Sequence, residues 1–179
     1  MTFTRPAPKP TTTAPPASAG QAFNWGPGDP VAVVGRASFT PAEAKGLKVE
    51  VNSLHLDASG VATLVWTLRN DGGGPIGYAL KLYRKLNSYY ADLSGFGEAA
   101  GLELVDTTRG LNYQPLRSSA DQCLCPRLAG GYNSKSKIWP GEAVTYANLY
   151  ELPPEVRTVQ LQIPWDASPG ATVTGLPVS

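Results

Sequence analysis

The chain has 179 residues, with 15 basic and 14 acidic side chains and a formal net charge of +1. This length allows one domain and a tail, and the near-neutral charge gives no electrostatic reason to expect nucleic acid or an anionic membrane as a partner. The 19 glycines and 17 prolines predict many turns and few long helices. No stretch approaches the roughly 18 apolar residues of a transmembrane helix, so no transmembrane segment is predicted.

Residues 1–28 contain no acidic residue and are rich in Pro, Thr and Ala, as in the stretch RPAPKPTTTAPPASAG. Such a segment has too little apolar surface to offset the entropy of ordering, and its prolines favour an extended chain. We therefore predict an extended linker or arm over residues 1–28 and a folded domain over residues 29–179. The arm is either a spacer or a segment that docks on a neighbouring molecule.

The first part of the domain reads as short strands. We predict a strand at 31–34, one helical turn at 39–44, and a half-buried strand that begins at Leu47 and alternates apolar and polar residues. The apolar positions change phase after residue 51, which predicts a β-bulge near Asn52-Ser53. The stretch 57–60, Asp-Ala-Ser-Gly, predicts a hairpin loop that Gly closes with a positive φ.

The next strand has Leu64, Trp66 and Leu68 on one face, and Trp66 is the predicted centre of the core. A loop at 70–75 follows. Residues 79–93 fit both a strand and a helix; we favour a strand to about residue 85, followed by a loop that contains two tyrosines.

The second half alternates strands with turns. Further strands are predicted at 102–106, 111–117, 143–150, 157–163 and 172–178, with a turn at 106–110 and a polar loop at 118–138. The predicted core set from both halves is Leu64, Trp66, Leu68, Leu104, Val159, Leu161 and Ile163. Eight or nine short strands without alternating helices predict an all-β sandwich or barrel.

Several short motifs occur together over residues 102–178: L-x-L-V-D followed by G and Y-x-P-L, then C-L-C at 123–125, P-G-E at 140–142, and V-Q-L-Q-I-P at 159–164. In this order the chain resembles uncharacterised immunoglobulin-like domains of secreted proteins and lipoproteins of high-GC bacteria, some of which lie beside OmpA-like domains. The resemblance implies an immunoglobulin-like antiparallel β-sandwich, secreted or at the cell surface, although the sequence carries no leader. The family supplies no catalytic residues.

Candidates for catalysis are few. The one histidine, His55, lies between two leucines on a predicted strand, where a position on a sheet face is expected. Asp57, Asp71, Asp106 and Asp121 all fall in loops; they could form a calcium site, but turn hydrogen bonding is the favoured interpretation. We therefore predict no catalytic residue, no metal site and no cofactor.

Cys123 and Cys125 are the only cysteines. In an extended chain residues i and i+2 project to one face, which brings the two sulfurs together. A local disulfide is the favoured prediction; free thiols and a ligand pair for Cu(I) or zinc remain the alternatives.

Aromatic residues in or beside loops are candidates for recognition, although they equally pack loops onto a core. They are Tyr89, Tyr90, Tyr132, Trp139 and Trp165. The predicted function is a non-catalytic extracytoplasmic interaction or structural module, with a protein partner or self-assembly. Two alternatives remain: a subunit of a virion or other extracellular assembly that contacts neighbours through its arm, and a module that binds carbohydrate or cell wall.

Overall fold

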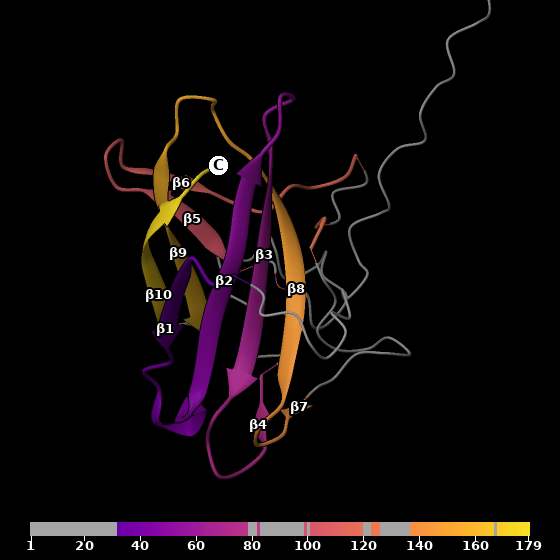
Figure 1. Ribbon diagram of the computed structural model, residues 1–179, viewed down its shortest axis with the longest axis vertical. Coiled ribbons are helices and arrows are strands. Elements are labelled where there is room, and N and C mark those ends of the chain that lie inside the picture. Colours follow the sequence, from indigo (N-terminus) through magenta and orange to yellow (C-terminus); the bar gives the residue numbers. More distant parts are fainter. Residues whose placement is uncertain are drawn as a thin grey trace, which may run out of the picture.

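The computed structural model describes residues 32–78, 82, 99, 101–119, 123–125, 137–166 and 168–179. This part of the chain is nearly all β, with one 3-10 turn, η1, at Ala42–Ala44. The strands are β1 Gly35–Ser38, β2 Leu47–Leu56, β3 Val61–Asn70, β4 Ile76–Gly77, β5 Glu103–Asp106, β6 Leu111–Tyr113, β7 Lys137–Ile138, β8 Ala143–Glu151, β9 Thr158–Trp165 and β10 Ser168–Pro177 (Figure 1). The predicted all-β class is confirmed.

The strands form two four-stranded sheets, with orders β1-β2-β3-β8 and β10-β9-β5-β6, and a small pair made of β4 and β7. Every pairing between these strands is antiparallel. In Figure 1 β2, β3 and β8 run side by side, and β9 and β10 lie to the left of β2 and farther from the viewer. No helix in the described part of the chain is long and apolar enough to cross a membrane.

One hydrophobic cluster draws on both four-stranded sheets. Strand β3 alternates strictly between buried and half-buried positions, and Trp66 at its centre is fully buried. All seven predicted core residues are at most 2% exposed. This prediction is confirmed because period-2 alternation places one set of side chains on the inner face of each strand.

The predicted bulge lies at Asn52. Val51 pairs with Trp66 and Ser53 pairs with Val65, so Asn52 is the extra residue of β2. Its side chain donates to the backbone oxygen of Ala32 at 3.3 Å and accepts from the Thr67 hydroxyl at 2.8 Å.

The hairpin loop after β2 is also confirmed. The Gly60 N–H donates to the Asp57 carbonyl, and Gly60 has a φ of +86°. The Asp57 carboxylate accepts from the Ser59 hydroxyl at 2.6 Å and from two backbone N–H groups, of Ser59 and Val61.

The first strand was predicted four residues too early. Residues 32–34 are not a strand, and β1 begins at Gly35. A Cβ at this glycine would lie 2.6 Å from the side chains of Val173 and Leu176, so only Gly lets β1 approach β10 this closely. The predicted helical turn at 39–44 is present as η1.

Three further predicted elements differ from the observed strands or lie outside the described residues. The strand predicted at 111–117 ends at Tyr113, and only isolated bridges at Pro115 and Arg117 follow, because Pro115 has no N–H with which to continue a ladder. The last strand begins at Ser168, earlier than predicted. The strand and tyrosine loop predicted within 79–93 lie outside the described residues, apart from Leu82.

Candidate functional site

A rigid turn joins β7 to β8. Pro140 occupies the second position of this turn, and Gly141 the third, with a φ of +78°. The Glu142 N–H closes it by donating to the Trp139 carbonyl at 3.0 Å. Proline second and a positive φ third define a type II turn. The Trp139 N–H in return donates to the Glu142 carboxylate at 3.0 Å.

Asn70, at the end of β3, ties this turn to the β3–β4 loop. Its backbone accepts from Gly141 and donates to the carbonyl of Glu142. Its fully buried side chain donates to the carbonyls of Gly74 and Ile138 at 2.8 and 3.0 Å. The two loops are therefore held as one unit by a polar residue with no access to solvent.

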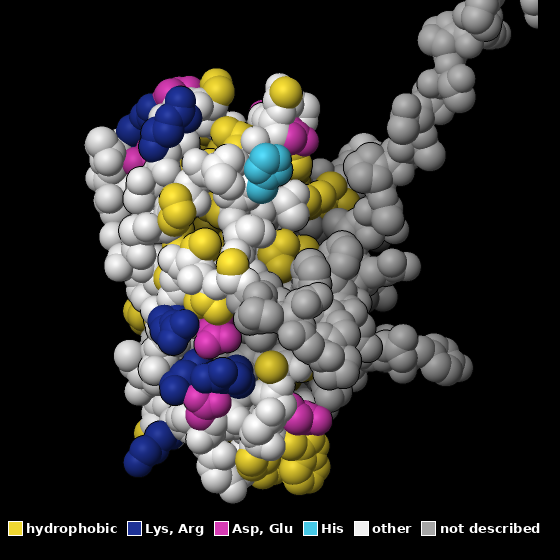
Figure 2. Space-filling model, viewed as in Figure 1, with side chains coloured by type: hydrophobic (Ala, Val, Ile, Leu, Met, Phe, Trp, Pro, Cys, Tyr) yellow, Lys and Arg dark blue, Asp and Glu magenta, His cyan; other side chains and the backbone are white. Residues whose placement is uncertain are grey.

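Trp139 projects from this unit into solvent. Its neighbour Ile138 is fully buried, whereas 57% of Trp139 is exposed, the most of any large hydrophobic residue that the structure describes. Figure 2 shows hydrophobic side chains gathered at the end of the molecule that carries β4 and β7. The ring is thus presented on a fixed backbone, which suits recognition.

Of the other predicted recognition aromatics, the structure describes only Trp165, which is buried. Trp165 is only 2% exposed, so the prediction that it serves a recognition surface is wrong. Its ring packs edge-on against Phe39, with centroids 5.4 Å apart, and its indole N–H donates to Glu43 at 2.9 Å. Tyr89, Tyr90 and Tyr132 lie outside the described residues.

Cys123 and Cys125 form a disulfide, as predicted, with their Cα atoms 5.2 Å apart. Cys123 pairs with Arg117 in an isolated antiparallel β-bridge. Leu124, which lies between the two cysteines, donates its N–H to the Leu116 carbonyl at 2.7 Å. Leu116 donates in turn to Leu149 of β8. Backbone hydrogen bonds therefore connect the disulfide segment to residues 116–117, and through Leu116 to β8.

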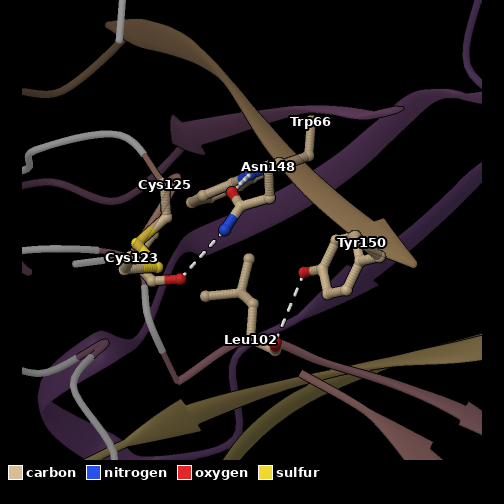
Figure 3. The surroundings of a disulfide bond; sticks show 7 residues. Trp66, Leu102, Cys123, Cys125, Asn148 and Tyr150 are labelled. Carbon is tan, nitrogen blue, oxygen red and sulfur yellow. Dashed lines mark hydrogen bonds between the residues drawn. A yellow bond between two sulfur atoms is a disulfide. The ribbon is translucent and has the colours of Figure 1, made fainter. Parts of the chain in front are cut away.

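The surroundings of the disulfide include a buried polar network (Figure 3). The Trp66 indole N–H donates to the Asn148 side chain at 2.9 Å, and the Asn148 amide donates to the Ala99 carbonyl at 3.0 Å. Tyr150 donates its hydroxyl to the Leu102 carbonyl at 3.3 Å. These contacts satisfy polar groups that burial would otherwise leave unpaired.

Burial raises the pKa of Tyr78, Tyr146 and Tyr150 above the ordinary value for tyrosine. Tyr78 and Tyr146 hydrogen-bond to each other through their hydroxyls. The ring centroids of Tyr146 and Trp66 lie 4.9 Å apart. All three tyrosines are therefore neutral at physiological pH and serve as packed core residues.

Asp57 and Asp106 accept hydrogen bonds within their turns, as predicted, whereas Asp71 forms ion pairs instead. The Asp106 carboxylate accepts from the backbone of Thr108 and Arg109 at 2.9 and 3.2 Å. Asp71 pairs with Lys48 at 2.7 Å, and the hydrogen bond from Lys48 lowers the pKa of Asp71. Asp121 lies outside the described residues.

His55, the one histidine, is exposed on β2 opposite Thr63. Within the described residues no three His, Cys, Asp or Glu side chains are grouped as metal ligands would be.

Sequence reasoning missed Asn70 and Asn148, the two buried amides that organise the loop end and the core. The only signal for Asn70 is its place before the Asp-Gly-Gly-Gly-Pro loop, and Asn148 carries none. Comparisons with protein-family models, curated proteins and solved structures find no match to this chain.

Proposed function

We propose that this chain is a non-catalytic interaction module of immunoglobulin-like fold that binds a protein partner through the loop end presenting Trp139. The observation that carries the proposal is a tryptophan, 57% exposed, on a hydrogen-bonded turn. Buried tryptophans at the centre of interfaces are among the residues that contribute most to binding. The disulfide supports an extracytoplasmic location, since such bonds persist in oxidising compartments.

Strand order supports the immunoglobulin-like sandwich. If β2, β3, β5, β6, β8, β9 and β10 are counted as strands one to seven, the sheets read 1-2-5 and 7-6-3-4. An immunoglobulin constant domain has strands 1, 2, 5 and 4 in one sheet and 3, 6 and 7 in the other. The arrangement differs from it in the sheet that holds strand four, in β1 as an added edge strand, and in the small β4–β7 pair.

The loop joined to the Trp139 turn has two open positions without side chains. Gly73 and Gly74 belong to the loop that Asn70 ties to the Trp139 turn. A Cβ added at either glycine would meet no atom within 4 Å. At these two positions a partner therefore meets open space and no side chain. Because Asn70 and the turn already fix the backbone, little entropy is lost on binding.

A photo-cross-linking amino acid in place of Lys137, which is exposed on β7 two residues before Trp139 and leaves the indole intact, tests the proposal. We expect a discrete cross-linked protein adduct in the cells that produce this chain, and none from position 111, where Leu111 is a matched exposed hydrophobic residue, 47% exposed, on β6. Trp139→Ala should remove the partner while changing the free energy of unfolding by less than about 0.5 kcal/mol. Equal labelling from both positions, or from neither, would contradict the proposal.

A further inference from the structure

The edges of the two large sheets differ in how well they are protected against pairing with another strand. β1 has only four residues, and β6 has three, with Pro115 shortly after it. β10 contains Pro169 and Pro177, and its register shifts at two places. Short strands, prolines and bulges are devices by which proteins prevent edge-to-edge association.

The remaining edge, β8, lacks these devices. It lies beside β3 and runs over nine residues, Ala143–Glu151 (Figure 1). Its register with β3 has no shift, and residues 143–150 include no proline, no glycine and no charged side chain. A long, regular and uncharged edge of this kind is a template for another strand.

The backbone groups of alternate β8 residues point away from β3. The carbonyl of Glu142, just before β8, accepts from Asn70 at the end of β3, whereas the Leu149 carbonyl accepts from Leu116 on the other side. Both backbone groups of a strand residue point to the same side, and the side alternates along the strand. Before Leu149, the residues of β8 that point outward are therefore Ala143, Thr145 and Ala147.

These three outward residues form the free edge of β8. Among the described residues, none accepts or donates a backbone hydrogen bond on the side away from β3. Ala143 is exposed, and Thr145 and Ala147 are half-buried. The free edge therefore offers three neighbouring residues whose N–H and C=O groups can all pair with a strand of another molecule.

We propose that a second copy of this chain pairs with the free edge, antiparallel and about a two-fold axis at Thr145. In this register Thr145 lies opposite the partner's Thr145, and Ala143 lies opposite the partner's Ala147. Every outward N–H and C=O of the free edge then has a hydrogen-bond partner, as a self-complementary two-fold interface requires. No charged side chain lies in this stretch, so no like charges meet across the axis.

The pairing deepens the proposed function by naming the partner, and it rests on that proposal only for the contact at Trp139. The turn that carries Trp139 directly precedes β8, so each turn lies beside the partner's β8. On the inner side of the sheet the half-buried Val144 lies opposite the partner's Tyr146, which adds apolar contact. The two sheets that contain β8 become one continuous sheet across the axis.

Analytical ultracentrifugation of the full-length chain tests the proposal. We expect a monomer–dimer equilibrium with a dissociation constant of about 1–100 μM, because pairing along one edge buries a small interface. Thr145→Lys and Thr145→Glu each place like charges opposite one another, so each should raise this constant by about tenfold or more. An equimolar mixture of the two variants should restore dimers, since opposite charges then meet at the axis.

Two further variants separate the pairing from effects on folding. Ala147→Pro removes an N–H that β3 does not use, so it should weaken the dimer by about tenfold or more while the monomer keeps its far-UV circular dichroism spectrum. Ser38→Glu is the control and should leave the dimer unchanged, because Ser38 is exposed on β1, at the opposite edge of the same sheet.

Several results would overturn the proposal. They are a chain that stays monomeric up to about 500 μM, folded Thr145 variants that dimerise as well as the wild type or do not pair in the mixture, and an equal loss in Ser38→Glu. Cross-links from position 137 between two copies of the chain would support the proposal. If the chain is monomeric while position 137 labels a different protein, this proposal fails and the proposed function stands.

Discussion

Asn148 should be among the most sensitive polar residues of the core. Its side chain is fully buried and holds two partners, the Trp66 indole N–H and the Ala99 carbonyl. Asn148→Ala leaves both partners without a hydrogen bond. Each unsatisfied buried group costs about 1–3 kcal/mol, so the free energy of unfolding should fall by about 2–6 kcal/mol. Urea denaturation followed by far-UV circular dichroism measures the loss.

A double-mutant cycle separates this hydrogen bond from general disruption of packing. Trp66→Phe removes the indole N–H and leaves the Asn148 amide oxygen unpaired. In the double variant, Trp66→Phe with Asn148→Ala, neither orphaned partner of that bond remains. The double variant should therefore lose about 1–2 kcal/mol less than the sum of the two single losses.

Two outcomes would refute the role of the Trp66–Asn148 hydrogen bond in core stability. If the losses add to within about 0.5 kcal/mol, Trp66 and Asn148 are energetically independent, and the hydrogen bond has no role in core stability. A loss below about 0.5 kcal/mol in Asn148→Ala alone would mean that its partners find other hydrogen bonds.

Two further predictions concern the loops. Replacing Cys123 and Cys125 with Ser should lower the melting temperature by no more than about 5 °C, because so short a loop hardly restricts the unfolded chain; scanning calorimetry showing a much larger drop would contradict this. For Asp57, the hydrogen bond from the Ser59 hydroxyl, the largest cause, lowers the pKa below its ordinary value of 3.8. A depressed folded-state pKa stabilises the protein above the unfolded pKa, and that stability is lost as pH falls through the folded pKa. Asp57→Asn should therefore lose less stability than the wild type between about pH 5 and pH 2 in urea titrations; identical pH dependence would count against it.

The alternating strands were predictable because their information is local. In β2 the apolar positions change phase at Asn52, and a phase change in a period-2 pattern requires an extra residue at that point. The sequence therefore placed the bulge at Asn52-Ser53, and the extra residue is Asn52. The same alternation identified Trp66 and its neighbours as core.

The position of β1 was not predictable, because its determinants lie more than a hundred residues away. Residues 31–34 are the more hydrophobic segment, yet the strand forms at Gly35–Ser38. The reason is the missing side chain at Gly35, which allows contact with Val173 and Leu176 of β10. Apolar content favours a strand, but close packing against β10 decides where it forms.

The two tryptophans beside prolines show where sequence reasoning about the site stops. Trp139 precedes Pro140 and Trp165 follows Pro164, and both were predicted as loop aromatics. The exposure of Trp139 has a local cause, since the Pro-Gly-Glu turn directs it away from the buried Ile138. The burial of Trp165 has a distant one: Glu43, 122 positions away in the sequence, accepts its indole N–H. Local turn sequence can therefore predict which aromatic residues are exposed candidates. Only the tertiary fold shows which of these candidates already contacts a partner within its own chain.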